Sequence, residues 1–195
     1  MSVWVEAALG RAAHLVTRFF ASLRARPLDA ATVAWVTDAL EPGELQVWDG
    51  MGRADRAESA AVGRRLEASL AGTPDAGDPR WLAAALVHDV GKQVSGYGTF
   101  GRAAVTAVAV VLGRARLRGW ATATSSDAPA SIRGRMGRYV AHDDLGAALL
   151  QRAAARPEIV AWAGAHHRAD CWSGTGIPAA VCRALARADG EPVAI

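Results

Sequence analysis

The residues of this 195-residue chain best suited to chemistry are His88 and Asp89, which stand side by side at the end of an apolar segment. Burying an imidazole and a carboxylate costs free energy unless both are paired or bound to a metal. Lys92 follows three residues later, and it is the only lysine among the 22 lysine and arginine residues. Its compact ammonium can donate to a phosphate or to a leaving oxygen. The segment therefore predicts a reactive centre in which Asp89 and Lys92 are catalytic.

Further side chains of metal-ligand type fall at or near the ends of predicted helices: His142, His166, His167 and Asp189. With His88 and Asp89 they form a set of imidazoles and carboxylates from four helices. Such a set suits one or two ions of Mn, Fe, Co, Ni or Zn, and its carboxylates leave Mg open. A carboxylate such as Asp89 can bridge two ions, and a two-ion site activates water for attack on phosphorus.

Glu58 is a further candidate ligand. It shares the apolar face of a helix predicted over residues 53–70 and stands four residues before Val62. A carboxylate on an apolar face needs a cation, a metal or a route to water. The pattern is equally consistent with a pair to a neighbouring arginine and with a place among the metal ligands.

Apolar residues recur at helical spacing along the chain, and no segment alternates convincingly as a strand would. Asp78-Pro79 is a strong helix start, and the helix it opens delivers His88 and Asp89 at its end. The sequence predicts a break at Glu41-Pro-Gly43 and a loop or lid over residues 119–133, and it predicts an all-α fold. The expected helices cover residues 3–23, 29–40, 53–70, 79–88, 101–112, 143–151, 157–167 and 178–189.

Hydrophobic residues make up 51% of the chain and charged residues 21%, which is typical of a globular protein rather than a disordered one. The net charge of +3 admits an anionic substrate without calling for nucleic acid. Arg135 and Arg138, which precede His142, could bind such a substrate, although solvated surface arginines explain them equally well.

Cys171 and Cys182 form no CxxC pattern, which favours a reducing compartment over a disulfide framework. The first residues lack the pattern of a signal peptide. The most apolar run, residues 103–112, is about half the ~20 residues that a membrane span needs. We therefore expect a cytoplasmic protein with no membrane partner.

Four segments, taken in order, resemble the HD-domain superfamily of metal-dependent phosphohydrolases, whose members are all-α. Leu86-Val-His-Asp-Val-Gly-Lys92 is similar to the defining His-Asp segment, and Ala184-Leu-Ala-Arg-Ala-Asp-Gly190 to the closing Asp helix. The resemblance covers about residues 45–190. It implies an HD-like helical domain over residues 45–195, preceded by a helical extension over residues 1–44.

The two middle segments carry the histidines. His142 with Gly146-Ala147 resembles the family's middle His segment. Ala165-His-His-Arg168, followed by Gly174-Thr-Gly-Ile-Pro178, is similar to the His-His and Gly-x-x-Pro segment of the subgroup that acts on cyclic dinucleotides.

The resemblance implies a ligand set. His88, Asp89 and Asp189 would hold one ion, and Asp89 would bridge to a second ion held by His142, His166 and His167. Glu58 stands where the family's first histidine usually lies. It would supply an oxygen ligand that favours a harder ion, or leave the first site weak or empty, with Asp55 as a stand-in.

The implied function is hydrolysis of a phosphomonoester, a nucleotide or a cyclic-nucleotide phosphodiester, with Lys92 stabilising charge or protonating the leaving oxygen. The partner would be a phosphorylated small molecule or nucleotide. Two alternatives stay open: a degenerate HD domain that binds a nucleotide or partner without turnover, which Glu58 supports, and a di-iron oxygenase. The extension would cover the site or form the interface of a homo-oligomer.

Overall fold

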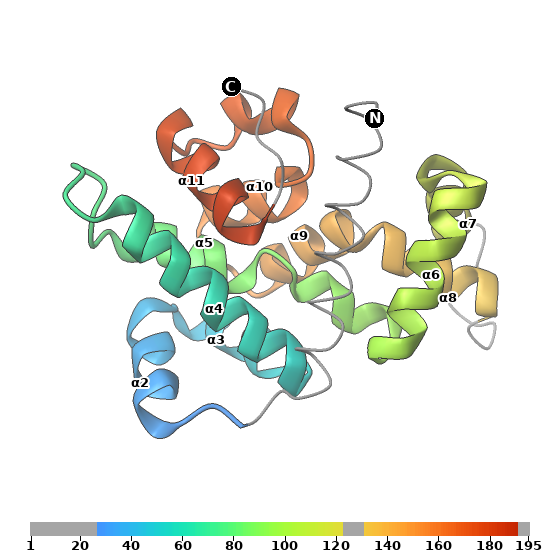
Figure 1. Cartoon of the computed structure of the whole chain (residues 1–195), viewed down its shortest axis with the longest axis horizontal. Helices are drawn as coiled ribbons and strands as arrows, with labels where there is room; N and C mark the ends of the chain where they lie inside the picture. Colours follow the sequence, from blue (N-terminus) through green and yellow to red (C-terminus); the bar gives the residue numbers. More distant parts are fainter. Residues whose placement is uncertain (1–26, 123–130, 191–195) are drawn as a thin grey trace, which may run out of the picture.

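The computed structural model describes residues 27–122 and 131–190, and these are helical with no strand (Figure 1). The all-α prediction is confirmed for this part of the chain. The helix predicted over residues 3–23 lies outside it. No helix in these two ranges has the length and apolar character needed to span a membrane.

The first two described helices show one success and one failure of the sequence reading. Helix α2 (Ala30–Ala39) begins at Asp29, which accepts a 2.7 Å hydrogen bond from the backbone N–H of Thr32. The chain leaves the helix at Leu40 and Glu41, where a break was expected, but helix α3 (Pro42–Asp49), which was not expected, begins directly after it. Proline is favoured in the first turn of a helix, and Glu41 and Glu44 form a reciprocal capping box there. The expected domain boundary between residues 44 and 45 therefore falls inside α3.

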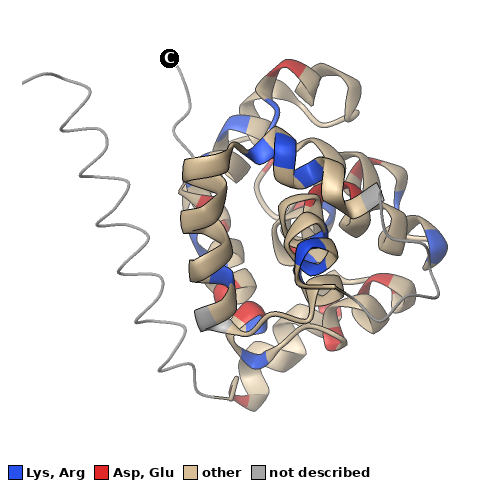
Figure 2. Ribbon diagram, turned by 90° about the vertical axis from the view of Figure 1, so that its right-hand side faces the viewer, with Lys and Arg blue, Asp and Glu red and all other residues tan. Residues whose placement is uncertain are grey.

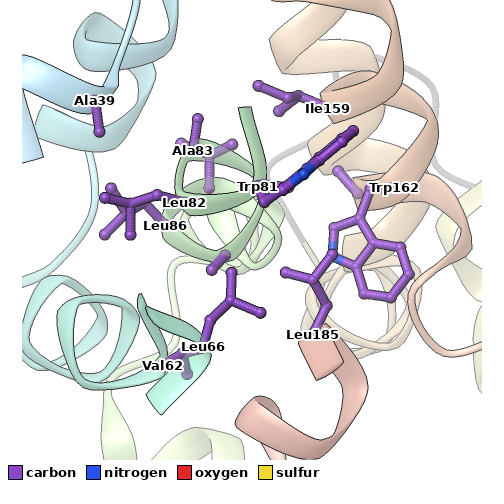
Figure 3. Close-up of a cluster of buried hydrophobic side chains, with 14 of the residues drawn as sticks. Ala39, Val62, Leu66, Trp81, Leu82, Ala83, Leu86, Ile159, Trp162 and Leu185 are labelled. Atoms are coloured by element: carbon purple, nitrogen blue, oxygen red, sulfur yellow. The ribbon is translucent and has the colours of Figure 1, made fainter. Parts of the chain in front are cut away.

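Helix α5 (Pro79–Val87) is the centre of the main core. Every residue from Trp81 to Val87 is buried, because α2, α3, α4 (Arg53–Leu70), α10 (Pro157–Ala165) and α11 (Ala179–Asp189) all contact this helix. Figure 3 shows its side chains meeting those of the surrounding helices. The labelled partners are Ala39, Val62, Leu66, Ile159, Trp162 and Leu185.

Three further helices, α6 (Thr99–Leu112), α7 (Arg114–Thr122) and α8 (Ile132–Val140), lie together at one side of the molecule (Figure 1). They have a small apolar cluster of their own: Val105, Ala109, Leu117 and Val140. The predicted loop over residues 119–133 is therefore wrong at both ends, and residues 123–130 lie outside the described ranges. Gly137 explains the close packing of α7 on α8, because a Cβ there would overlap the backbone of Ala121.

The remaining elements line the side of the molecule that holds the histidines. They are the 3-10 helix η1 (Val90–Ser95), α9 (His142–Arg152) and the 3-10 helix η2 (Ala169–Gly174), followed by α11. Helix α9 begins at His142, one residue before the predicted start, so Asp143 and Asp144 lie in its first turn and do not cap it. Both pair instead with Arg118 of α7.

Candidate metal centre

Three histidines are held in the same local way. His88 and His166 are the C-cap residues of α5 and α10, and His142 is the first residue of α9. Because a carbonyl oxygen can only accept, each Nδ1 carries a proton and each Nε2 turns toward a common centre. The acceptors are the carbonyl oxygens of Ala85, Tyr139 and Ala163, each three residues before its histidine. The distances from Nδ1 to these oxygens are 2.8, 2.9 and 2.9 Å.

Asp89 lies between these imidazoles. Its Oδ1 is 3.2 Å from Nε2 of His142 and 3.9 Å from Nε2 of His166. Its Oδ2 is 3.4 Å from Nε2 of His88. Asp189, the last residue of α11, places its Oδ1 3.4 Å from the same His88 nitrogen. The two carboxylate oxygens of Asp89 therefore face different histidines.

The ligand-type atoms form two groups, and within each group all of them lie within 4.8 Å of one another. One group combines one imidazole with two carboxylates, and the other has three imidazoles. Nitrogen and oxygen donors of this kind suit Mn, Fe, Co, Ni and Zn. The groups are His88, Asp89 and Asp189, and His142, His166 and His167.

Several buried polar atoms at the centre lack a hydrogen-bond partner among the described residues: Nε2 of His88, Oδ1 of Asp89 and Nε2 of His166. Such atoms are rare in folded proteins, because an unsatisfied buried polar group is costly. A cation bound between them would satisfy all three at once. The residues therefore fit a metal ion.

The electrostatics of the first group balance two carboxylates against two cations. Burial disfavours the charged imidazole of His88, but Asp89 and Asp189 outweigh it and raise its pKa to about 10. Burial also disfavours the Asp89 carboxylate, yet Lys92 and His88 hold its pKa well below the usual value. Burial acts on Asp189 in the same way, and His88 again outweighs it and lowers the pKa of that carboxyl. Both carboxylates are therefore charged, as ligands must be, and a metal ion bound by Nε2 of His88 would replace the proton that this imidazole carries without metal.

Two histidines of the second group, His142 and His166, are neutral by contrast. Burial lowers the pKa of His142, and burial together with the neighbouring His167 lowers that of His166 well below the usual value. Neutral imidazoles are the form that binds metals. The rings of His166 and His167 lie close together, with centroids 3.9 Å apart, and Nε2 of His167 is 3.3 Å from Nε2 of His142.

Lys92 reaches the centre from η1. Its Nζ forms an ion pair with Oδ2 of Asp89, and its side chain is 18% exposed. His167 is exposed, whereas His88, His142 and His166 are buried. The centre therefore opens to solvent on the side of Lys92 and His167.

Glu58 belongs to neither group in the part of the chain that the structure describes. Its Oε1 accepts a 3.1 Å hydrogen bond from Arg65, whose Nε donates to the carbonyl of Ala188 at 2.7 Å. Through these two hydrogen bonds Arg65 connects α4 to α11 at the residue before Asp189. One turn after Glu58, Val62 lines a small cavity that His88, His166 and Asp189 also border. Helix α4 thus presents an apolar side chain there.

The two predicted substrate arginines have different surroundings. The guanidinium of Arg135 donates to the carbonyls of Ser95 and Gly96, at 3.2 and 2.6 Å, and stacks on Tyr97. Arg135 therefore fixes the end of η1. Arg138 is half-buried on α8, and among the described residues it has no ion pair or hydrogen bond of its side chain.

The structure thus brings together six of the predicted ligands and leaves Glu58 outside. No family model, no curated protein and no solved structure matches this chain. The sequence reading missed the carbonyls that orient the histidines, since a backbone acceptor three residues earlier leaves no side-chain signal.

Proposed function

We propose that this protein is a metal-dependent phosphohydrolase of the HD type, acting on a phosphomonoester, a nucleotide or a cyclic-nucleotide phosphodiester. The observation that supports this most is the position of Asp89, whose two oxygens face ligands of two different groups. Two-ion sites occur in phosphatases and nucleases, where the ions stabilise the attacking and leaving oxygens. The order of the His and Asp segments is the second support.

In this proposal His88, Asp89 and Asp189 would hold one ion, and His142, His166 and His167 would hold the other. Bound ions would supply Lewis acidity to a phosphoryl oxygen and lower the pKa of a water molecule. The carbonyls behind the three buried histidines keep each Nε2 aimed at the centre.

Lys92 is the proposed charge-stabilising group. It lies at the solvent-facing edge of the centre, beside Asp89. An ammonium there can donate to a phosphoryl oxygen or give a proton to the leaving oxygen. The exposed His167 lies at the same opening, so we infer that the substrate enters on this side.

One observation favours a second function, binding without turnover. Glu58 pairs with Arg65, and the neighbouring Val62 lines the cavity beside His88. The first group therefore has three candidate ligands, and α4 adds no fourth ligand that would raise its affinity for a metal ion. A weakly held first ion would leave a domain that binds a phosphorylated ligand and does not hydrolyse it.

The test is turnover of a panel of phosphoesters by protein loaded with Mn or Fe. The proposal expects hydrolysis that Asp89→Asn abolishes and that Lys92→Gln lowers by about 10²- to 10⁴-fold, the usual contribution of a proton-transfer group. Asp49→Asn, on the exposed end of α3, is the matched control and should be fully active. Metal-loaded protein that binds phosphate without any turnover would establish the second function, and turnover that requires oxygen would indicate an oxygenase.

A further inference from the structure

Helix α6 is apolar on more than one side. Its sequence from Thr99 to Leu112 contains a single charged residue, Arg102. One side packs on α7 and α8, where Val105 and Ala109 are buried in the small apolar cluster of these helices. A helix that is apolar all round is usually buried all round. The opposite side of α6 is exposed all the same, and it is the anomaly from which we argue.

The exposed side carries a continuous stripe of apolar residues. At about 100° per residue, its members lie within about 60° to either side of Ala107. Val110 and Val111 are 80% and 81% exposed, more than any other large apolar side chain in the described part of the chain. A contiguous apolar surface of this kind marks an interaction site. The members of this α6 stripe are Ala103, Ala104, Ala107, Val110 and Val111.

The α6 stripe is graded in size, with its alanines first and its valines last. In an antiparallel pair of α6 helices with a two-fold axis at Ala107, Val111 faces Ala103 of the second copy and Val110 faces Ala104. Large side chains then face small ones, which fills the space between the helices. Ala107, on the axis, lets the two backbones approach closely. A two-fold interface uses one patch on both chains, and this stripe is complementary to itself.

The charges at the two ends of α6 favour the same orientation. Arg102, in the first turn, is paired with Asp55 of α4. Arg114 and Arg116 follow the last turn and are exposed. Figure 2 shows this side of the molecule with Lys and Arg in blue and Asp and Glu in red. A parallel pair would bring the exposed arginines of both copies together, whereas an antiparallel pair separates them by about 20 Å, beyond the Debye length of about 8 Å.

We propose that α6 forms the interface of a homodimer, in which the α6 stripes of two copies pack antiparallel across a two-fold axis at Ala107. This interface goes beyond the proposed function and does not require a metal. A pair of 14-residue helices is small beside a standard interface of about 1,600 Å², so the dimer forms reversibly.

The test is sedimentation equilibrium of the full chain over a wide range of protein concentration. The mass should rise with concentration from that of one chain to twice that value. Val111→Glu should hold the mass at one chain throughout, because the pair would bury unpaired carboxylates. Val33→Glu, at a valine of α2 that is 41% exposed, is the matched control and should dimerise like the unsubstituted protein. An unsubstituted protein that stays monomeric, or a Val111→Glu variant that dimerises equally well, would overturn the inference.

Cysteine cross-linking tests the antiparallel order. Two copies of Ala107→Cys meet at the axis and should form a disulfide on oxidation with copper phenanthroline. Two copies of Ala103→Cys lie about 12 Å apart along the helix, beyond the reach of a disulfide. The native Cys171 and Cys182 are present in both variants, so the unsubstituted protein gives the background. Equal cross-linking of the two variants would indicate a parallel pair and contradict the inference.

An intramolecular cover for the stripe gives a different result. The helix expected over residues 3–23 lies outside the described ranges. If this segment covered the stripe of its own chain, the unsubstituted protein would be monomeric at every concentration, and Val111→Glu would lower its melting temperature. That outcome would overturn the homodimer. In the homodimer, circular dichroism of Val111→Glu should show unchanged helical content, because the substituted side chain faces solvent in the single chain.

Discussion

The backbone of Gly91 lies directly against the carbonyl group of His142, and a Cβ atom on Gly91 would overlap that oxygen. The same Cβ would lie 2.6 Å from the backbone nitrogen of Gly146. This contact allows η1 to approach the start of α9, and it brings Oδ1 of Asp89 to 3.2 Å from Nε2 of His142. The glycine that follows the His-Asp pair thus assembles the centre from two elements distant in sequence.

Gly91→Ala should therefore damage both stability and metal binding. The added methyl forces η1 away from α9, with an expected loss of about 1–3 kcal/mol in the free energy of unfolding. Metal content should fall because Asp89 moves away from His142. Gly174→Ala, where a Cβ meets no atom within 4 Å, is the control and should change neither quantity. Full metal content in the Gly91→Ala variant would refute the role of this contact.

Glu44→Gln should be among the most destabilising polar substitutions. Glu44 is fully buried, and its carboxylate accepts two hydrogen bonds from Arg156. One comes from Nη2 at 2.6 Å and the other from the backbone N–H at 3.1 Å. Removing one partner of a buried pair costs about 3–5 kcal/mol, because the other charge is left uncompensated. Urea unfolding measures this loss. Asp49→Asn, which breaks an exposed pair with Arg56, should cost less than about 1 kcal/mol, and a similar cost for both variants would contradict the prediction.

The metal-free protein should be most stable near pH ~6.5, the usual pKa of histidine. The raised pKa of His88, about 10, gives a stabilisation that is complete below pH ~6.5 and is lost as the pH rises through about 10. His142 and His166 have lowered pKa values, so their burial destabilises the fold as the pH falls below ~6.5. Asp89 and Asp189, also lowered, add a further loss in acid below pH ~4.

Melting temperatures of chelator-treated protein between pH 4 and 10 check this profile. His88→Gln should flatten the alkaline side, because the raised pKa belongs to that imidazole. A profile of the unsubstituted protein that is level from pH 7 to pH 9.5 would show that His88 is not protonated between the two carboxylates.

Glu58→Gln should leave the metal content unchanged. The pair with Arg65 is partly exposed, with side chains 31% and 49% accessible, so its loss should cost no more than about 1 kcal/mol. Asp189→Asn, which alters a member of the first group, should release metal. Elemental analysis of the two variants side by side distinguishes them. Loss of metal from the Glu58→Gln variant would make Glu58 a ligand after all.

The sequence predicts the parts of the structure that depend on local signals. Asp29 and Asp78 mark helix starts because their side chains accept hydrogen bonds from backbone N–H groups in the first turn. The ligand-type residues could be identified because they lie at the ends of apolar helices, where burying an imidazole or a carboxylate costs free energy unless it is paired or bound to a metal. Helix α3 was missed because Glu41-Pro-Gly43 contains both a helix start and a breaker.

The parts that could not be predicted depend on tertiary contacts. Glu58 pairs with Arg65 instead of facing the centre. Arg65 is held in place by a hydrogen bond to the Ala188 carbonyl of α11, which is distant in sequence. The role of Arg135 depends on the end of η1, forty residues away in sequence. No local pattern encodes either contact.

Metal analysis of protein purified without chelator is the most direct test of the two-group centre. After incubation with Mn or Fe, the protein should hold about two ions per chain, His88→Ala and His166→Ala about one each, and Asp89→Ala close to none, because the two oxygens of Asp89 face histidines of both groups. Helical content should be the same in all four proteins. The opposite result, no bound metal in the unsubstituted protein or the same content in the Asp89→Ala variant, would contradict the assignment of the centre.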